Sequence, residues 1–338
     1  MNPITALRRI GFLLERQQAP TYRVRAFRTA ALVLAGLSPA EMRRRTADGT
    51  LTDLKGIGPK TSAVIRQALA GDTPDYLVAL EEQLTPLVSG GEDLRAALRG
   101  DLHAHSDWSD GGSPVEEMAV TALELGHEYL AMTDHSPRLT VANGLSPERL
   151  ERQLDLIAKV NVQLAGQGFR LLSGIECDIN EDGTLDQSDE LLGRVDIVVA
   201  SVHSKLRSES GAMTRRMLRA IENPHTDVLG HCTGRLVTGG RGTRPESQFD
   251  AERVFHACVE HDVAVEINSR PERLDPPRRL LRQAVEAGCR FSVDTDAHAP
   301  GQLDWQPYGA ARAQECGVPT ERVINTWPVE QLLAWAKA

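Results

Sequence analysis

Seven short apolar runs, each ending in a cluster of polar residues, constrain the fold of this chain more than any other feature. The runs span residues 100–105, 129–135, 169–176, 195–203, 226–231, 263–268 and 290–296. Helical patterns lie between them, for example at 114–126, 147–165, 210–222 and 248–261. Continuous apolar strands that alternate with helices are typical of a parallel sheet. Seven such units predict an α/β fold, a distorted (β/α)7 barrel, over residues 99–338.

The first part of the chain has a different character. Apolar residues recur at helical spacing with arginines between them, which predicts a small all-α domain over residues 1–88. The whole chain has a net charge of −9, yet residues 1–70 hold 12 Lys and Arg against 4 Asp and Glu. A basic domain joined to an acidic one indicates that the basic part meets a polyanion. Residues 89–98, which include Ser89-Gly90-Gly91, are predicted to be a linker.

A glycine-rich turn lies inside the basic domain. The segment Gly56-Ile57-Gly58-Pro59-Lys60 between helical stretches predicts a helix-hairpin-helix turn. Glycines let the backbone approach a phosphate, and the amides at the start of the next helix point toward it. A plain turn is the alternative, but the basic surroundings favour DNA. The candidate DNA contacts, which would follow the backbone rather than the base sequence, are Gly56, Gly58, Lys60, Arg23 and Arg25.

The polar clusters at the strand ends predict a metal centre, because a parallel barrel gathers these ends at one mouth. His103 and His105 are two residues apart on a strand, so they share a face. Histidine with carboxylate and without thiolate suits zinc, manganese or iron. Nine candidates are too many for one ion and suit two or three divalent ions, an arrangement used in phosphoester hydrolysis. The candidate ligands are His103, His105, Asp110, His135, Glu176, His203, His231, Asp296 and His298.

The sequence indicates less specific roles for other residues near the strand ends. Arg235 follows His231 and is a candidate catalytic residue that would contact phosphate and stabilise the charged transition state, because an arginine fork matches phosphate oxygens. A surface salt bridge is the alternative for Arg235, and still more for Arg270, Arg273 and Lys205. We interpret Cys232 as a buried small apolar residue rather than a soft ligand. The histidines that we interpret as structural are His127, His225, His256 and His261.

The ordered motifs of residues 100–325 resemble those of the polymerase and histidinol phosphatase (PHP) superfamily. The resemblance implies a distorted (β/α)7 barrel with a trinuclear site in which Glu176 and Asp296 are bridging, catalytic carboxylates. It implies that His103 and His105 bind the first metal with these two bridges, and that His203 and His231 bind the second with Glu176. It also implies a third metal on Asp110, His135 and His298. Asp110 departs from members with histidine there, and Cys232 departs from the more usual proline.

Residues 1–85 resemble the small N-terminal domain of family X DNA polymerases, whose bacterial members also end in a PHP domain. About fifteen residues separate the two parts here, which leaves no room for a nucleotidyltransferase palm and excludes polymerase activity. Val64 stands where some members carry a lyase lysine, which argues against abasic-site lyase activity. The two resemblances imply a DNA-binding, metal-dependent phosphoesterase. We expect a 3′-5′ exonuclease or 3′-end processing enzyme of DNA repair.

Three alternatives remain from the sequence. One is a small-molecule phosphatase of the histidinol-phosphatase type, in which residues 1–88 would serve oligomerisation. An amidohydrolase is disfavoured, because Glu176 stands where that family needs a carboxylated lysine. A non-catalytic DNA-binding module is disfavoured by the nearly complete ligand set. Five cysteines without a Cys-x-x-Cys pair predict a reducing cytoplasm, with nucleoid association if bacterial, and no apolar run is long enough to predict a membrane span.

Overall fold

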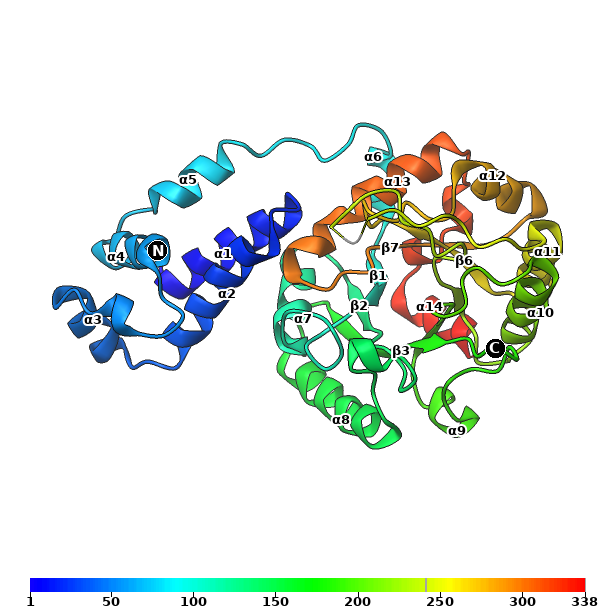
Figure 1. Ribbon diagram of the computed structural model, residues 1–338, viewed down its shortest axis with the longest axis horizontal. Coiled ribbons are helices and arrows are strands. Elements are labelled where there is room, and N and C mark those ends of the chain that lie inside the picture. The colour runs from blue at the N-terminus through cyan, green and yellow to red at the C-terminus, as the bar shows by residue number, and fades with distance from the viewer. Residues whose placement is uncertain (241, 338) are drawn as a thin grey trace. The chain divides into compact units, whose positions relative to one another are not determined.

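The computed structural model describes residues 1–240 and 242–337 (Figure 1). The chain divides into two compact units, of which the first is Met1–Pro86 and the second begins at Leu87. We call them the head and the barrel. None of the helices in the described ranges combines the length and the apolar character that crossing a bilayer requires.

The head is helical. Two of its helices begin where the sequence supplies a cap: the Asn2 side chain accepts from the Ile4 amide, and the Ser38 hydroxyl accepts from the Glu41 amide. Apolar side chains such as Leu7, Ile10 and Ile65 meet in one core. The helices are α1 (Pro3–Arg16), α2 (Thr21–Ala35), α3 (Pro39–Ala47), α4 (Pro59–Ala70) and α5 (Asp75–Glu81), with a 3-10 turn η1 (Leu51–Asp53).

The hairpin turn between η1 and α4 packs against α2. Gly56 has a φ of +101°, and a Cβ there would lie 2.7 Å from Thr29 Cγ2. Glycine is therefore required both by the backbone conformation and by the close approach to α2. Gly58 precedes α4, and its amide donates to Thr61 Oγ1 at 2.9 Å.

The barrel contains a seven-stranded sheet in the order β1 to β7, with every neighbouring pair parallel. Ala104 at the end of β1 bridges to Ala297 beyond β7, and the His105 amide donates to the Ala297 carbonyl at 2.7 Å. These contacts bring the first and last strands together, and the predicted α/β barrel is confirmed. The strands are β1 (Gly100–Ala104), β2 (Tyr129–Met132), β3 (Arg170–Asp178), β4 (Ile197–Ser201), β5 (Val228–Leu229), β6 (Ala264–Asn268) and β7 (Phe291–Asp294).

Helices surround the strands (Figure 1), and the main core lies between them and the sheet. The five cysteines are buried and free, with Cys232 packed in this core. The helices are α6 (Glu92–Ala97), α7 (Val115–Glu124), α8 (Pro147–Gln163), α9 (Asp189–Leu192), α10 (Ser210–Ile221), α11 (Ala251–Glu260), α12 (Arg278–Ala287), α13 (Gln306–Glu315) and α14 (Val329–Ala336). Short 3-10 turns are η2 (Thr140–Ala142), η3 (Pro300–Trp305), η4 (Thr320–Arg322) and η5 (Ile324–Thr326).

Residues 89–98, the predicted linker, contain the short helix α6. Its Leu94 is buried in the barrel core, and the Gly91 amide donates to Gln314 Oε1 of α13. A Cβ on Gly91 would lie 2.4 Å from the backbone of Ala310, so this contact needs a glycine. This part of the segment is thus packed onto the barrel.

Candidate metal centre

The ends of the strands bring the nine candidate ligands into one cluster. His103 lies in β1, Glu176 lies in β3, and six others follow directly in the loops after a strand. Asp110 arrives from further along the loop after β1. Parallel strands place their carboxyl ends at one mouth of a barrel, and that topology explains why residues nearly 200 positions apart meet here.

Glu176 lies at the middle of this cluster, with histidines on both of its oxygens. Its Oε1 is 2.8 Å from His231 Nε2 and 3.1 Å from His203 Nε2. Its Oε2 is 2.8 Å from His135 Nδ1, 3.4 Å from His103 Nε2 and 3.5 Å from His105 Nε2. Each oxygen therefore faces a separate set of imidazoles, as a bridging carboxylate would.

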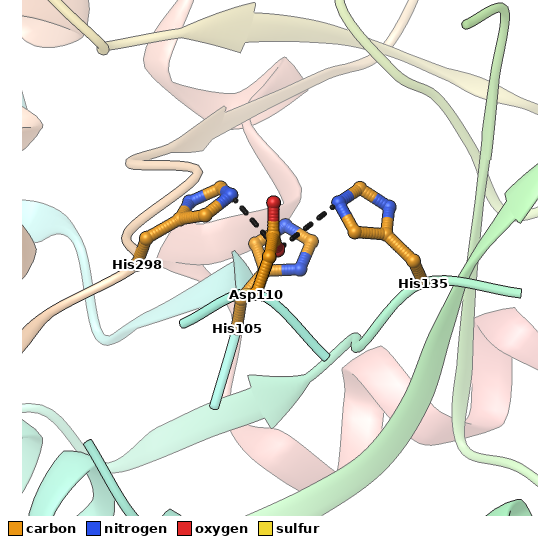
Figure 2. A group of neighbouring side chains, drawn as sticks. All are labelled: His105, Asp110, His135 and His298. Carbon is orange, nitrogen blue, oxygen red and sulfur yellow. Dashed lines mark ion pairs between the residues drawn. The ribbon is translucent and has the colours of Figure 1, made fainter. Parts of the chain in front are cut away.

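A second group forms around Asp110 (Figure 2). Its Oδ1 lies 3.4 Å from His135 Nε2 and 3.4 Å from His298 Nε2. His105 lies beside them, and its ring is 4.2 Å from that of His298. Candidate ligand atoms lie within 4.8 Å of one another in three sets, which are His105, Asp110, His135 and His298; His103, His105 and Glu176; and His135, Glu176 and His203.

The ring nitrogens fit divalent metals better than they fit hydrogen bonds. His103 Nε2, His105 Nε2, His203 Nε2 and His135 Nδ1 are buried and have no hydrogen-bond partner among the described residues, although each lies near a Glu176 oxygen. Buried polar atoms are normally satisfied, so four orphan nitrogens around one carboxylate need an explanation. Imidazole nitrogens and carboxylate oxygens around a shared centre are a donor set for zinc, manganese or iron.

Burial and mutual charge set the protonation of this cluster. Burial alone would raise the pKa of Glu176, but its histidines, His203 foremost, hold it well below its usual value. Burial lowers the pKa of His105 to about 3, helped by His298 and His135. Burial and Arg273 also lower the pKa of His231. Burial alone would also lower the pKa of His103, His135 and His203, but nearby carboxylates, Glu266 for His103 and Glu176 for the other two, raise it, that of His135 to about 10. An ionised carboxylate with neutral imidazoles is the form that binds a metal, so a bound ion would displace the protons of these three rings.

Three buried carboxylates orient the ligands from behind. Glu266 accepts from the His231 amide at 2.5 Å, and its other oxygen lies 2.5 Å from His103 Nδ1. Asp178 accepts from the His203 amide at 3.1 Å. Asp134 accepts from the amide and hydroxyl of Ser106 at 2.9 and 2.6 Å, so it fixes the loop that carries Asp110. Sequence reasoning gave these three no role; their only signal was a carboxylate at a strand end.

The arginines near the mouth differ in what they contact. Arg235 Nε donates to the Arg273 carbonyl at 3.1 Å, and its Nη2 donates to the Leu274 carbonyl. Arg270 Nη1 donates to the Asp296 carbonyl at 3.1 Å and lies 2.9 Å from His298 Nδ1. Arg273 Nε donates to Asp296 Oδ2 at 2.9 Å. The predicted phosphate contact Arg235 thus has backbone partners here, and its phosphate role stays a prediction.

The structure also places the predicted DNA contacts of the head. Arg25 is exposed and lines a hollow of about 430 Å³ together with Tyr22 and the hairpin glycine Gly56. Lys60 is exposed at the second position of α4. Arg23 instead donates to the Tyr76 hydroxyl at 2.7 Å, within the head. Arg25 and Gly56 therefore line one surface, whereas Arg23 is hydrogen-bonded within the head, and its DNA contact stays a prediction.

Comparisons with known proteins agree with this two-part architecture. The PHP domain family matches residues 101–270, and the helix-hairpin-helix domain family matches residues 2–74. The "DNA polymerase/3'-5' exonuclease PolX" of Bacillus subtilis (strain 168) is 38% identical over 240 residues, which are 71% of this chain and 41% of that protein. The chain therefore spans about two fifths of the length of this relative.

Other similar proteins lack the polymerase name. A "Probable phosphatase" of Thermoanaerobacter sp. (strain X514) is 27% identical over 245 residues, covering 67% of this chain and 89% of that protein. The crystal structure of a histidinol phosphate phosphatase from Lactococcus lactis, in complex with zinc, L-histidinol and phosphate, has a TM-score of 0.48. It is 18% identical and covers 65% of this chain and 94% of that one.

The PHP match covers about half of the chain and includes seven of the nine candidate ligands, from His103 to His231. The barrel supplies the rest of the set, Asp296 and His298, at the end of its last strand. The chain belongs to the PHP domain family of metal-dependent phosphoesterases, and it carries a helix-hairpin-helix domain in front of that barrel.

Proposed function

We propose that this protein is a DNA-binding phosphoesterase that processes DNA 3′ ends, as a 3′-5′ exonuclease or a 3′-phosphatase. The observation that carries the proposal is the joining, in one chain, of a cluster of histidine and carboxylate ligands and a basic hairpin domain. The cluster suits hydrolysis of a phosphoester, and the hairpin suits a DNA backbone. The similarity to the Bacillus subtilis relative supports DNA as the substrate.

The candidate ligands would hold two or three divalent ions. As the family resemblance implies, His103, His105 and Asp296 would hold one ion, His203 and His231 a second, and Asp110, His135 and His298 a third, with Glu176 shared by the first two. Such ions, when bound, lower the pKa of water and neutralise charge on phosphoryl oxygens. The identity of the metal is a proposal of zinc, manganese or iron, based on the donor set.

The protein's own residues decide where a substrate enters. Side-chain exposure is 37% for Asp110, 18% for His298 and 11% for His203, whereas Glu176 and His103 are fully enclosed. The phosphoester would therefore approach along the edge formed by these three side chains. Lys205 and Arg207 follow His203 in the same loop and are exposed, so they are placed to contact a phosphate backbone outside the centre.

A small-molecule phosphatase is the second candidate. It is favoured by relatives named as phosphatases that align with most of their own length. In that case the head would play no part in substrate binding, and DNA would be neither a substrate nor an inhibitor of the reaction.

The two candidates separate in one assay on the full chain. We would measure hydrolysis of 3′-labelled gapped duplex DNA, of histidinol phosphate and of a chromogenic phosphomonoester, with Glu176→Gln as the inactive control. DNA processing together with inhibition of the chromogenic reaction by unlabelled duplex supports our proposal. Turnover of histidinol phosphate that is indifferent to duplex DNA, with no change at labelled 3′ ends, would establish the small-molecule phosphatase instead.

A further inference from the structure

The two oxygens of Asp296 have different surroundings. Arg273 Nε donates to Oδ2 at 2.9 Å, and Asn268 Nδ2 donates to the same oxygen at 3.3 Å. Arg273 is only 7% exposed, and Asn268 is fully buried. One oxygen of this candidate ligand is thus occupied by protein donors that solvent does not reach.

The other oxygen faces the histidines. Asp296 Oδ1 lies 3.5 Å from His105 Nε2 and 3.4 Å from His298 Nδ1. Arg270 Nη1 lies 3.5 Å from Oδ1, but its shorter contact is with the Asp296 carbonyl at 3.1 Å. Glu176 contrasts with this arrangement, because both of its oxygens face imidazoles.

The loop that carries Arg273 is fastened on both sides. Arg235 donates to the carbonyls of Arg273 and Leu274. Asp275 accepts from the amide and hydroxyl of Thr233 at 3.2 and 2.8 Å, and its carbonyl accepts from the Asn268 amide at 2.9 Å. The loop therefore ties together the ends of β5 and β6 and delivers Arg273 to the end of β7.

The backbone at Asp296 needs such support. Its φ is +52°, in the left-handed region that non-glycine residues adopt only rarely. A conformation of this kind persists where surrounding contacts fix it, and it clusters at functional sites. The guanidinium of Arg273 supplies one of these contacts with a rigid, planar donor that a flexible lysine does not reproduce.

We propose that Arg273 is a positioning residue that, with Asn268, holds Asp296 as a ligand through Oδ1 alone. Glu176 is then the bridging carboxylate, and Asp296 is not, in contrast to the two bridges that the family resemblance implies. Arg235 fastens the Arg273 loop through its bonds to the carbonyls of Arg273 and Leu274. This inference rests on the metal centre proposed above and adds a role for residues outside the ligand set.

The test measures binding of Mn²⁺ alone to the full chain, with free ion counted by electron paramagnetic resonance. Arg273→Ala should weaken binding about 10–100-fold, the usual effect of removing a partner of a metal ligand. Methylguanidinium added to this variant should restore binding, and methylammonium should not. Arg194→Ala, a 46% exposed arginine paired with Glu151, is the matched control and should bind as the wild type does.

Two results would overturn the inference: wild-type or tighter Mn²⁺ affinity in folded Arg273→Ala, or equal rescue by the two cations. If Arg273→Ala does not fold, Arg273→Lys keeps the charge and is expected to bind about tenfold more weakly. Wild-type affinity in that variant would equally overturn the inference. Failure of the wild type itself to bind Mn²⁺ would instead defeat the proposed metal centre, so the two failures are distinguishable.

Discussion

A buried carboxylate has different partners in the head and in the barrel. In the head, Arg28 donates to both oxygens of Glu15, at 2.9 and 2.6 Å, so this pair is complete without any ligand. In the barrel, Glu176 has five imidazoles within 3.5 Å, and most of the facing nitrogens make no hydrogen bond to the part of the chain that the structure describes. The buried charges of this head pair are thus balanced by protein groups, whereas the nitrogens around Glu176 still need a bound cation. Metal binding should therefore change the stability and activity of the barrel and leave the stability of the head unchanged.

The strongest way to sharpen this contrast is to remove one charge at the centre. Glu176→Gln should lose bound metal and about three decades of phosphoesterase rate, similar to losing a main electrostatic stabiliser of a transition state. DNA binding by the head should be unchanged. Metal content by elemental analysis, turnover of a chromogenic phosphoester and a DNA gel shift measure the three effects. Glu151→Gln, at an exposed surface pair, is the control; normal turnover in metal-loaded Glu176→Gln would refute the site.

A matching substitution in the head should destabilise the head and leave the barrel unchanged. Glu15→Gln leaves the Arg28 cation buried without its carboxylate, and breaking a buried pair this way costs about 3 kcal/mol. Hydrogen exchange of head amides should accelerate accordingly, while barrel amides and metal content stay as in the wild type. Exposed Glu82→Gln is the control. Loss of metal in Glu15→Gln would show that the two units are not independent.

A buried histidine outside the metal centre provides a pH test. His127 is 3% exposed, and neither of its ring nitrogens has a partner within the described ranges. Burial, followed by Arg95, lowers the pKa of His127 from 6.5 to about 3. The unfolded chain therefore binds a proton in this interval that the folded chain does not, so stability is full above pH 6.5 and is lost as the pH falls toward 3.

We expect this histidine to remove up to about 3 kcal/mol of barrel stability between pH 6.5 and about pH 4. In His127→Leu that part of the pH dependence should disappear. Urea unfolding of metal-free protein at several pH values measures it, with exposed His256→Leu as the control. An unchanged pH slope in His127→Leu would show that folding does not lower the pKa of His127.

The smallest expected effect lies on the head's surface. Lys60→Ala should reduce the slope of log affinity for DNA against log salt by about one, because it removes one phosphate contact. Hydrolysis of a small phosphoester should not change. Lys159→Ala on α8 of the barrel is the matched exposed control. An effect of Lys60→Ala on small-substrate turnover would place the head inside the active site.

The strand-end residues could be predicted because topology alone decides where they meet. Once seven parallel strands are recognised, His103 and Asp296 must share a mouth although 193 positions separate them. The contacts behind the ligands could not be predicted in this way. The meeting of His103 with Glu266, and of Asp296 with Arg273, depends on loop paths and side-chain directions that periodicity does not contain.

The contacts of Arg235 also depend on a loop path that the sequence pattern does not contain. Its place after His231 predicts a phosphate contact, but that place does not reveal the hydrogen bonds that its guanidinium donates to the carbonyls of the next loop. The helix α6 is a second example, because a glycine-rich segment resembles a linker until its packing partner α13 is known. Glycine at position 91 serves close packing there, and sequence alone does not distinguish this from flexibility.

The most direct test of the central claim is anomalous diffraction from crystals of the full chain grown with Mn²⁺ or Zn²⁺. We expect at least two metal peaks, on opposite sides of the Glu176 carboxylate, each about 2.0–2.2 Å from one of its oxygens. No metal is expected on Asp296 Oδ2, where Arg273 lies. Metal peaks in loaded crystals that avoid Glu176 altogether would refute Glu176 as the shared ligand.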